Sequence, residues 1–154
     1  MSKKFLLSVF ILSVLALSSG CAVNRATATV SADADLGKVK TFYVVQQPKD
    51  ERGIEKLISD NLNARGFLAN WGPEMQTPPA GVDAVVTYVD KWMWDITMYL
   101  LELTLTIRNP ANNFPMANAN SYHTSLTRKS PPEMVDEVLT NIFNEQAKKQ
   151  GALQ

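Results

Sequence analysis

Cys21, the single cysteine of the chain, has the surroundings that most clearly indicate a chemistry. It follows a basic start with Lys3 and Lys4, thirteen uncharged residues over 5–17, and the small residues of 18–20. A membrane-spanning helix needs roughly 20 apolar residues, whereas a signal peptide needs an apolar region of only about 7–15 that ends at small residues. Residues 1–20 are therefore predicted to be a cleaved signal peptide.

The segment Leu17-Ser18-Ser19-Gly20-Cys21 resembles the lipobox of bacterial lipoproteins, in which small residues precede a cysteine that is acylated before cleavage. The resemblance implies that Cys21 becomes the lipid-modified first residue of the mature protein, anchored by palmitate-type chains without a transmembrane helix. The alternative is a plain secretory peptide and an incidental thiol, but a lone cysteine is unusual in an oxidising compartment. In a Gram-negative cell, Ala22 in place of aspartate implies delivery to the outer membrane, facing the periplasm.

A second set of candidate residues is Asp90, Trp92 and Trp94, which alternate along a segment of strand character. Alternation places these three on one strand face, and Lys91 and Asp95 on the other. Two tryptophans could stack on a sugar or grip a peptide while Asp90 accepts hydrogen bonds. The alternative is packing in the core or at a hairpin, where a buried indole N–H needs a partner. The three are candidate partner-binding residues for an envelope protein, peptidoglycan or a glycolipid.

Evidence for catalysis is weaker. Asp90, Asp95 and Glu102 could converge into a carboxylate pair of the kind that cleaves glycosidic bonds, and an envelope glycan or lipid hydrolase is the alternative function. The only histidine, His123, has no nucleophile motif beside it and is predicted to be structural or at the surface. One histidine and a lipid-committed cysteine cannot build a zinc shell, so no metal and no cofactor are expected. The preferred function is that of a lipid-anchored envelope lipoprotein, a non-enzymatic binding or assembly and integrity module at the outer membrane.

Composition limits the mature chain to one near-neutral domain. Removal of residues 1–20 leaves 134 residues, with thirteen basic and fifteen acidic side chains and a net charge of −2. That length suits a single domain, and the chain has no basic field for nucleic acid. Residues 21–37 are small and polar and are predicted to be a flexible tether after the lipidated cysteine. The domain is predicted over 38–148, followed by a frayed C-terminus at 149–154.

Hydrophobic spacing predicts the elements that must position these residues. Strands are expected over 39–45, 67–69, 82–95, 96–108 and 116–126, with Leu101, Leu103, Leu105 and Ile107 on the buried face of the fourth. A helix is expected over 51–65, with Asp50 as its N-cap and Gly66 as its stop signal. A second helix is expected over 132–148, introduced by a capping box from Ser130 to Glu133.

The resulting order, β-α-β-β-β-β-α, predicts an α+β fold: a mostly antiparallel sheet of four to five strands with two helices on one face. The segments 34–42, 58–67 and 82–88, together with the C-terminal helix, resemble small Gram-negative lipoproteins of domain-of-unknown-function family 4136. That resemblance implies an envelope lipoprotein with an α+β domain, and it implies no site residues.

Overall fold

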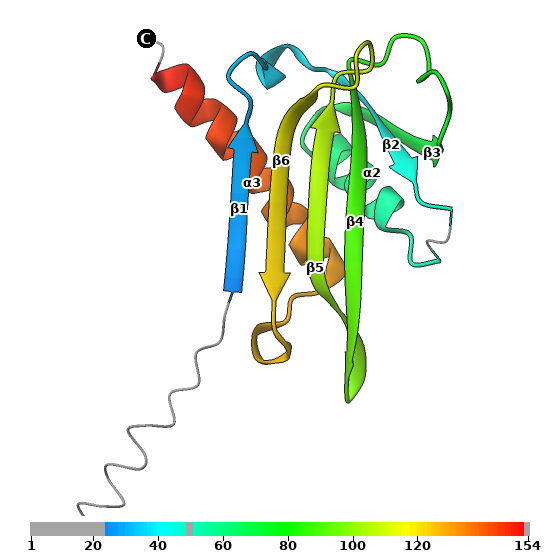
Figure 1. Ribbon diagram of the computed structural model, residues 1–154, viewed down its shortest axis with the longest axis vertical. Helices are drawn as coiled ribbons and strands as arrows, with labels where there is room; N and C mark the ends of the chain where they lie inside the picture. Colours follow the sequence, from blue (N-terminus) through cyan, green and yellow to red (C-terminus); the bar gives the residue numbers. More distant parts are fainter. Residues whose placement is uncertain (1–23, 49–50, 153–154) are drawn as a thin grey trace, which may run out of the picture.

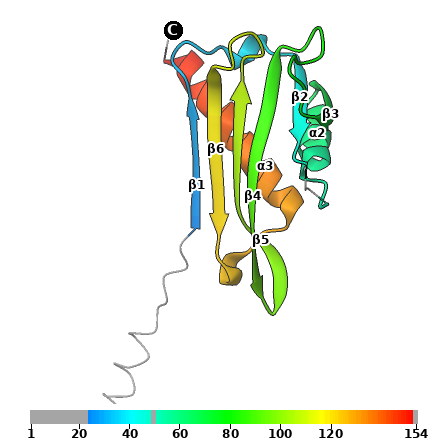
Figure 2. The ribbon, with the colours of Figure 1, turned by 45° about the vertical axis from the view of Figure 1, so that its right-hand side comes forward.

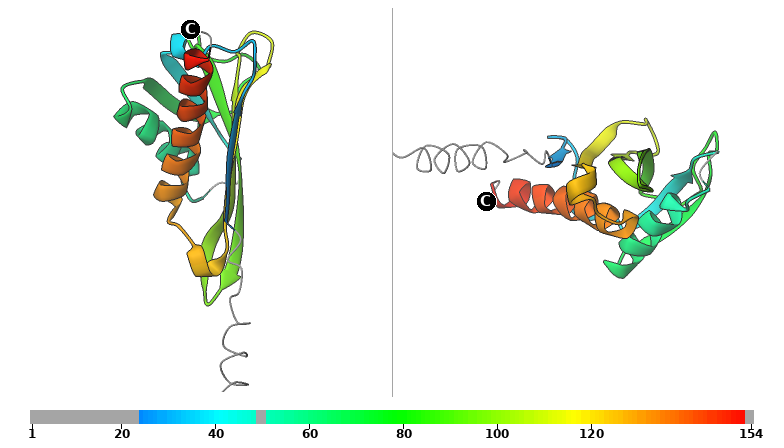
Figure 3. Two further views of the ribbon diagram at one scale, coloured as in Figure 1. Left: turned by 90° about the vertical axis from the view of Figure 1, so that its left-hand side faces the viewer. Right: turned by 90° about the horizontal axis from the view of Figure 1, so that it is seen from below.

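The structure, a computed structural model, describes residues 24–48 and 51–152. Its strands are β1 (Asn24–Val30), β2 (Thr41–Gln46), β3 (Leu68–Pro73), β4 (Ala84–Asp95), β5 (Thr97–Arg108) and β6 (Pro115–His123). Its helices are α2 (Ile54–Ala64) and α3 (Pro131–Gly151), with short 3-10 turns η1 (Leu36–Lys38) and η2 (Ser125–Thr127). Both helices lie on one side of the sheet, which confirms the α+β class and the one-sided helix layer (Figure 3).

The sheet has six strands in the order β1-β6-β5-β4-β2-β3, not four to five (Figure 1). β1, β6, β5 and β4 pair antiparallel in that order, whereas β2 pairs parallel with both β3 and β4. The sheet is therefore mixed. Parallel neighbours need a crossover connection, and α2 makes the one between β2 and β3. Figure 2 shows α2 over the β2–β3 side of the sheet.

The prediction of a flexible tether over 21–37 is wrong for its described part. Residues Asn24 to Val30 form β1, which pairs with β6 along its whole length, from Asn24 with His123 to Val30 with Ala117. Most β1 side chains are exposed, so the segment has no strong apolar alternation. Its backbone groups are paired by a strand roughly ninety residues away in the chain, which local sequence does not reveal.

The rest of the predicted tether is folded against α3. Leu36 in η1 is buried, and its amide donates to the Gln146 side chain at 3.4 Å. Lys149 Nζ donates to the carbonyls of Ser31, Ala32 and Ala34 at 2.5–2.9 Å. Residue 149 is therefore part of an ordered helix that continues to Gly151, so the frayed end predicted at 149 is wrong for 149–151. These contacts attach the N-terminal segment to the last turns of α3.

The helix signals were largely reliable. In α3, the Glu133 carboxylate accepts from the Ser130 amide at 2.8 Å and from its hydroxyl at 2.7 Å, which confirms the capping box. Gly66 adopts φ +92° after α2, and the amide of Phe67 bonds the carbonyl of Leu62, as in a Schellman C-cap. The start predicted for this helix at residue 51 is too early, because α2 begins at Ile54 after Gly53, which has a left-handed backbone conformation. Asp50 lies outside the described residues.

A β-bulge changes which leucines of β5 are buried. Lys91 pairs with Glu102, but Trp92 pairs with Leu100, so Leu101 has no partner on β4. Beyond this extra residue the strand faces exchange. Leu103, Leu105 and Ile107 are buried as predicted, whereas Leu100 is fully buried in place of Leu101. The strict alternation predicted for Leu101 was therefore wrong.

Candidate functional site

Asp90 and Trp92 contact each other on the face of β4 that also carries the buried Tyr88. The Trp92 indole N–H donates to Asp90 at 2.5 Å, and the Arg52 guanidinium lies 4.0 Å from the Trp92 ring centroid. Trp92 is half-buried and packs against the core. Its N–H and one ring face are thus occupied within the chain, so Trp92 and Asp90 support the strand more than they offer a free surface.

Trp94 differs from Trp92 in being 70% exposed. It lies near the end of the β4–β5 hairpin, which extends beyond η2 in Figures 1 and 2. Asp95 pairs with Thr97, which leaves Ile96 alone in the turn. We define the hairpin tip as residues 93–98; its large apolar side chains are Met93, Trp94, Ile96 and Met98, exposed by 46–86%. So dense an exposed apolar group typically marks an interaction surface.

Ile96 is held in a backbone conformation that β-branched residues avoid. Its φ is +61°, and the only other non-glycine residue with positive φ in the described chain is Asn113. Asparagine tolerates this left-handed region, whereas a β-branched side chain there is a genuine outlier. Ile96 is 86% exposed, so packing within the domain does not explain its presence. An outlier of this kind is a reason to look for function at the tip.

The turn η2 lies beside the hairpin and adds one more apolar side chain. Arg128, just after η2, donates to the Thr97 hydroxyl at 2.8 Å and lies 4.9 Å from the Tyr99 ring centroid. Leu126 within η2 is 85% exposed. The Thr127 hydroxyl donates to the Asn24 side chain. The first described residue of the chain, η2 and the hairpin thus lie at one end of the sheet (Figure 1).

The structure does not bring the predicted carboxylate pair together. Lys91 and Glu102 are cross-strand partners, with Lys91 Nζ 2.7 Å from the Glu102 carboxylate, so the two share one sheet face. Asp90 precedes Lys91 in a regular strand and faces the opposite side. Asp95 lies in the tip, roughly 15 Å along the strand from Glu102 at about 3.3 Å per residue. These carboxylates therefore cannot flank one glycosidic bond.

Glu102 instead belongs to a polar network on the sheet face away from the helices. It accepts a hydrogen bond from Asn120 at 2.8 Å and forms an ion pair with Arg25 at 3.5 Å. The hydrogen bonds from Lys91 and Asn120 hold the pKa of Glu102 below its ordinary value. This network ties β1, β6, β5 and β4 together across the face, which is a structural role.

His123 lies in a buried polar cluster that sequence reasoning missed. The Glu137 carboxylate accepts from Ser121 Oγ at 2.5 Å and from Lys129 Nζ at 2.6 Å, and lies 2.8 Å from His123 Nε2. Burial raises the pKa of Glu137, but the three hydrogen bonds outweigh it and bring the pKa to about 2. The glutamate lies fourteen residues beyond His123, on another element, so local sequence gave no sign of the pairing.

This cluster does not have the geometry of an activated nucleophile. Ser121 is fully buried, and both its hydroxyl and His123 Nε2 contact the same Glu137 oxygen. A catalytic serine must instead bond to the base that removes its proton. His123 Nδ1 is buried without a hydrogen-bond partner in the described part of the chain. The cluster fastens α3 to β6, in keeping with the structural role predicted for His123.

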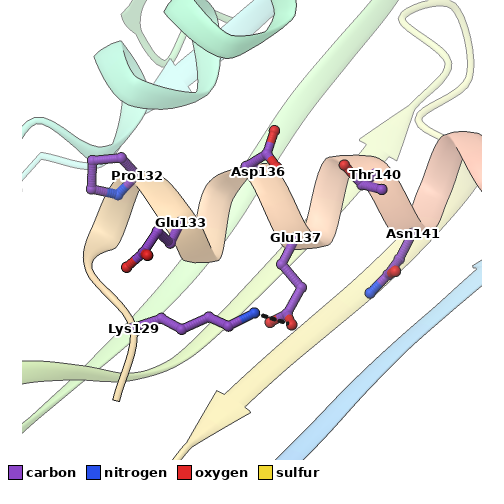
Figure 4. Close-up of a pocket in the computed structure, with 7 residues that line it drawn as sticks. All are labelled: Lys129, Pro132, Glu133, Asp136, Glu137, Thr140 and Asn141. Atoms are coloured by element: carbon purple, nitrogen blue, oxygen red, sulfur yellow. Dashed lines mark hydrogen bonds and ion pairs between the residues drawn. The ribbon is translucent and has the colours of Figure 1, made fainter. Parts of the chain in front are cut away.

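The hollow shown in Figure 4 lies over the first turns of α3 and measures about 510 Å³. Each carboxylate in its lining is already engaged. Glu133 caps the helix, Asp136 accepts from Arg65 at 2.7 Å, and Glu137 bonds Lys129 as the dashed line marks. No group of three or more histidine, cysteine or acidic residues with metal-binding geometry occurs within 24–48 and 51–152.

Comparison with known proteins identifies the fold but no family. No protein-family model matches the chain, and no curated protein matches it in sequence. A variant of the PelC dodecamer from Paraburkholderia phytofirmans superposes with a TM-score of 0.58 at 15% identity, covering 77% of this chain and 97% of that one. A second PelC dodecamer structure gives 0.54 at 14% identity, covering 78% and 98%. The likeness is one of fold alone.

A third structure, a minor lipoprotein from Acinetobacter baumannii, is 15% identical and covers 73% of this chain and 87% of that one. Its TM-score of 0.29 is too low to indicate a common fold. Across the residues that the structure describes, neither helix is long and apolar enough to span a bilayer. Cys21, the predicted lipidation site, lies outside the described residues.

The hairpin tip is the surface that sequence reasoning recovered only in part. The sequence pattern indicates Trp94 as a candidate, but it predicts Met93, Ile96 and Met98 within regular strands. Tight hairpin turns usually contain glycine, most often directly after an asparagine or an aspartate. Here Asp95-Ile96-Thr97 makes the reversal without glycine or asparagine. The one available signal was the density of large apolar residues around Asp95.

Proposed function

We propose that the protein is an envelope lipoprotein, anchored through acyl chains on Cys21 in the outer membrane, which serves as a non-enzymatic binding or assembly module facing the periplasm. The observation that carries the proposal is the position of β1. The strand begins at Asn24, three residues after the lipobox cysteine, so the domain starts almost at the anchor. A fold attached so directly to a lipid would work at the membrane surface and not at a distance from it.

The binding surface in this proposal is the hairpin tip, supported by Asp90 and Trp92 at its base. Its four large apolar side chains are exposed, and Ile96 adopts a strained backbone conformation. Natural domains rarely keep such a combination without a use for it. The resemblance to lipoproteins of family 4136 adds support for the envelope role, and membership of that family is part of the proposal.

The assembly aspect of the proposal draws on the shared fold. The PelC structures are described as dodecamers, and this chain has two edge strands, β1 and β3, at which a sheet could be extended. Edge strands carry backbone groups that can pair with another chain. Light scattering of the purified mature protein would measure its mass directly. A monomer at micromolar concentration would remove the assembly aspect and leave the anchored binding module.

The anchor is tested by metabolic labelling with an alkyne analogue of palmitate, followed by membrane fractionation and intact mass measurement. Wild type should carry the label and sediment with outer membranes, whereas Cys21→Ser should carry none and leave an uncleaved or soluble product. Ser19→Ala, which keeps a small residue before the cleavage site, is the matched control and should label normally. Unchanged label and unchanged membrane partition in Cys21→Ser would overturn the proposal.

A further inference from the structure

The proposed binding surface lies at the same end of the fold as the proposed anchor. Asn24 pairs with His123 on β6, and the neighbouring Tyr122 pairs with Glu102 on β5. Asn24 is therefore level with about residue 101 of β5, four to five residues from the turn at Ile96. At about 3.3 Å per residue, the tip extends roughly 15 Å beyond Asn24 along the strand direction.

We propose that the hairpin tip, together with Leu126, inserts into the headgroup region of the bilayer that holds the Cys21 acyl chains. The inference rests on the proposed lipidation of Cys21. Cys21 and Asn24 are three residues apart, and a fully extended chain spans at most about 3.6 Å per residue, or about 11 Å in all. With the strands along the membrane normal, the tip thus reaches at least as deep as the backbone of Cys21.

The side chains of the tip suit this depth. Trp94 is 70% exposed and Ile96 86%, and they are joined by Met93, Met98 and the neighbouring Leu126. Tryptophan is enriched at membrane interfaces, where its apolar ring and its N–H donor are both accommodated. Arg128, which bonds Thr97 at the tip, carries a positive charge of the kind that lipid phosphate groups attract. By contrast, the polar and charged side chains of the Glu102 network lie on the open sheet face between β4 and β1, which does not suit contact with lipid.

The backbone of the tip also suits a membrane. Unpaired amide and carbonyl groups are costly in lipid, so a segment that enters it must satisfy them internally. The β4–β5 ladder continues to the pair Asp95 and Thr97, which leaves Ile96 alone unpaired in the turn. A glycine- or asparagine-containing loop of several residues would expose more polar backbone. In this tight turn the exposed group at the apex is the apolar side chain of Ile96, and few polar backbone groups are left unpaired.

The decisive measurement uses the full lipidated protein, reconstituted into vesicles of phosphatidylethanolamine and phosphatidylglycerol that contain brominated phospholipid. The chain has three tryptophans, so Trp71→Phe combined with Trp92→Phe leaves Trp94 as the only residue excited at wavelengths selective for tryptophan. Its emission should shift to the blue, and bromine attached near the headgroups should quench it. Solvent-like emission without quenching would overturn the proposal, even if Trp94 were then found cross-linked to a protein.

A matched control retains Trp71 instead, through Trp92→Phe combined with Trp94→Phe. Val44 pairs with both Trp71 and Val86, and Trp94 follows Val86 by eight residues, so the two indoles lie about 26 Å apart along the strands. Trp71 is 44% exposed and accessible to a collisional quencher. It should escape bromine quenching. Equal quenching of both would mean that the domain lies flat on the bilayer, against the proposal.

A second experiment separates the tip from the anchor. The soluble Cys21→Ser mature chain is titrated with the same vesicles, and Trp94→Ala should weaken its partition roughly tenfold, since burial of a large apolar side chain is worth about that factor or more. Leu68→Ala, at a 69% exposed position on β3, is the control and should change nothing. Absence of acyl groups on wild type by mass measurement refutes the anchor alone. Identical partition of the Trp94→Ala and unsubstituted soluble chains refutes the tip.

Discussion

Replacing Ile96 by asparagine should make the protein more stable, because the turn at the hairpin tip strains an isoleucine backbone. At φ +61°, the left-handed conformation costs an ordinary L-residue about 1–2 kcal/mol, and asparagine tolerates it better. Ile96 is 86% exposed. If complete burial of such a side chain is worth about 1.5–3 kcal/mol, the lost contacts amount to only about 0.3 kcal/mol.

The net expectation for Ile96→Asn is a gain of about 1 kcal/mol in the free energy of unfolding. For a domain of this size, that gain corresponds to a rise of about 4 °C in the melting temperature. Urea unfolding of the soluble Cys21→Ser mature chain, followed by circular dichroism, measures the effect without interference from tryptophan signals at the tip. The same substitution should reduce vesicle binding, so that stability and binding change in opposite directions.

The control is Leu126→Asn, since Leu126 is 85% exposed and is not among the residues with positive φ. Its unfolding free energy should stay within about 0.5 kcal/mol of the unsubstituted value, as at an ordinary surface position. A loss of stability in Ile96→Asn would mean that the isoleucine makes contacts that offset its backbone strain. Equal gains in both variants would show that removal of exposed apolar surface, and not relief of strain, is responsible.

Three further predictions follow from the fold. The Glu137 carboxylate should stabilise the wild-type fold by about 3 kcal/mol above about pH 4.5, and this stabilisation should disappear as pH falls through its folded-state pKa of about 2. Glu137→Gln should lack it. In urea unfolding at a series of pH values, the difference in unfolding free energy between wild type and variant should close between pH 5 and 2. Leu100→Ala should cost about 2–5 kcal/mol and Leu101→Ala far less, because the bulge buries Leu100; equal losses in thermal unfolding would count against the bulge. Asn113→Ile should cost about 1 kcal/mol by calorimetry, because φ is +58° there; a neutral result would remove the strain assigned to isoleucine at such angles.

The candidate site was within reach of sequence only as single residues. The alternation of Asp90, Trp92 and Trp94 is visible in the sequence, and so is Cys21 at the end of a predicted lipobox. Sequence did not indicate that one tryptophan is satisfied by Asp90 and Arg52 while the other is exposed. That difference depends on the tertiary structure, because Arg52, forty residues earlier in the chain, covers the Trp92 ring, whereas Trp94 lies beside the exposed turn.

The short-range features of the fold were determined by sequence alone, because their causes are local. A capping box and a glycine stop satisfy backbone groups within a few residues, so Ser130 to Glu133 and Gly66 were readable directly. The apolar stripe of α3 and the patterned half of β5 reflect one-sided burial with a fixed period. The prediction of a signal peptide over residues 1–20 is also local, because it depends on the length of the apolar region, the basic start and the small residues before Cys21.

The tertiary structure decided what depends on distant partners. β1 is held as an edge strand by backbone hydrogen bonds to β6. Because most of its side chains are exposed, its sequence has no apolar alternation that would predict a strand. The bulge at Leu101 appears only when β4 and β5 are in register. The meeting of Asn24, η2 and the hairpin at one end of the sheet follows from strand order. Sequence predicts a lipid on Cys21, and the fold shows that the domain begins at Asn24, three residues later, with the apolar hairpin tip at the same end of the sheet.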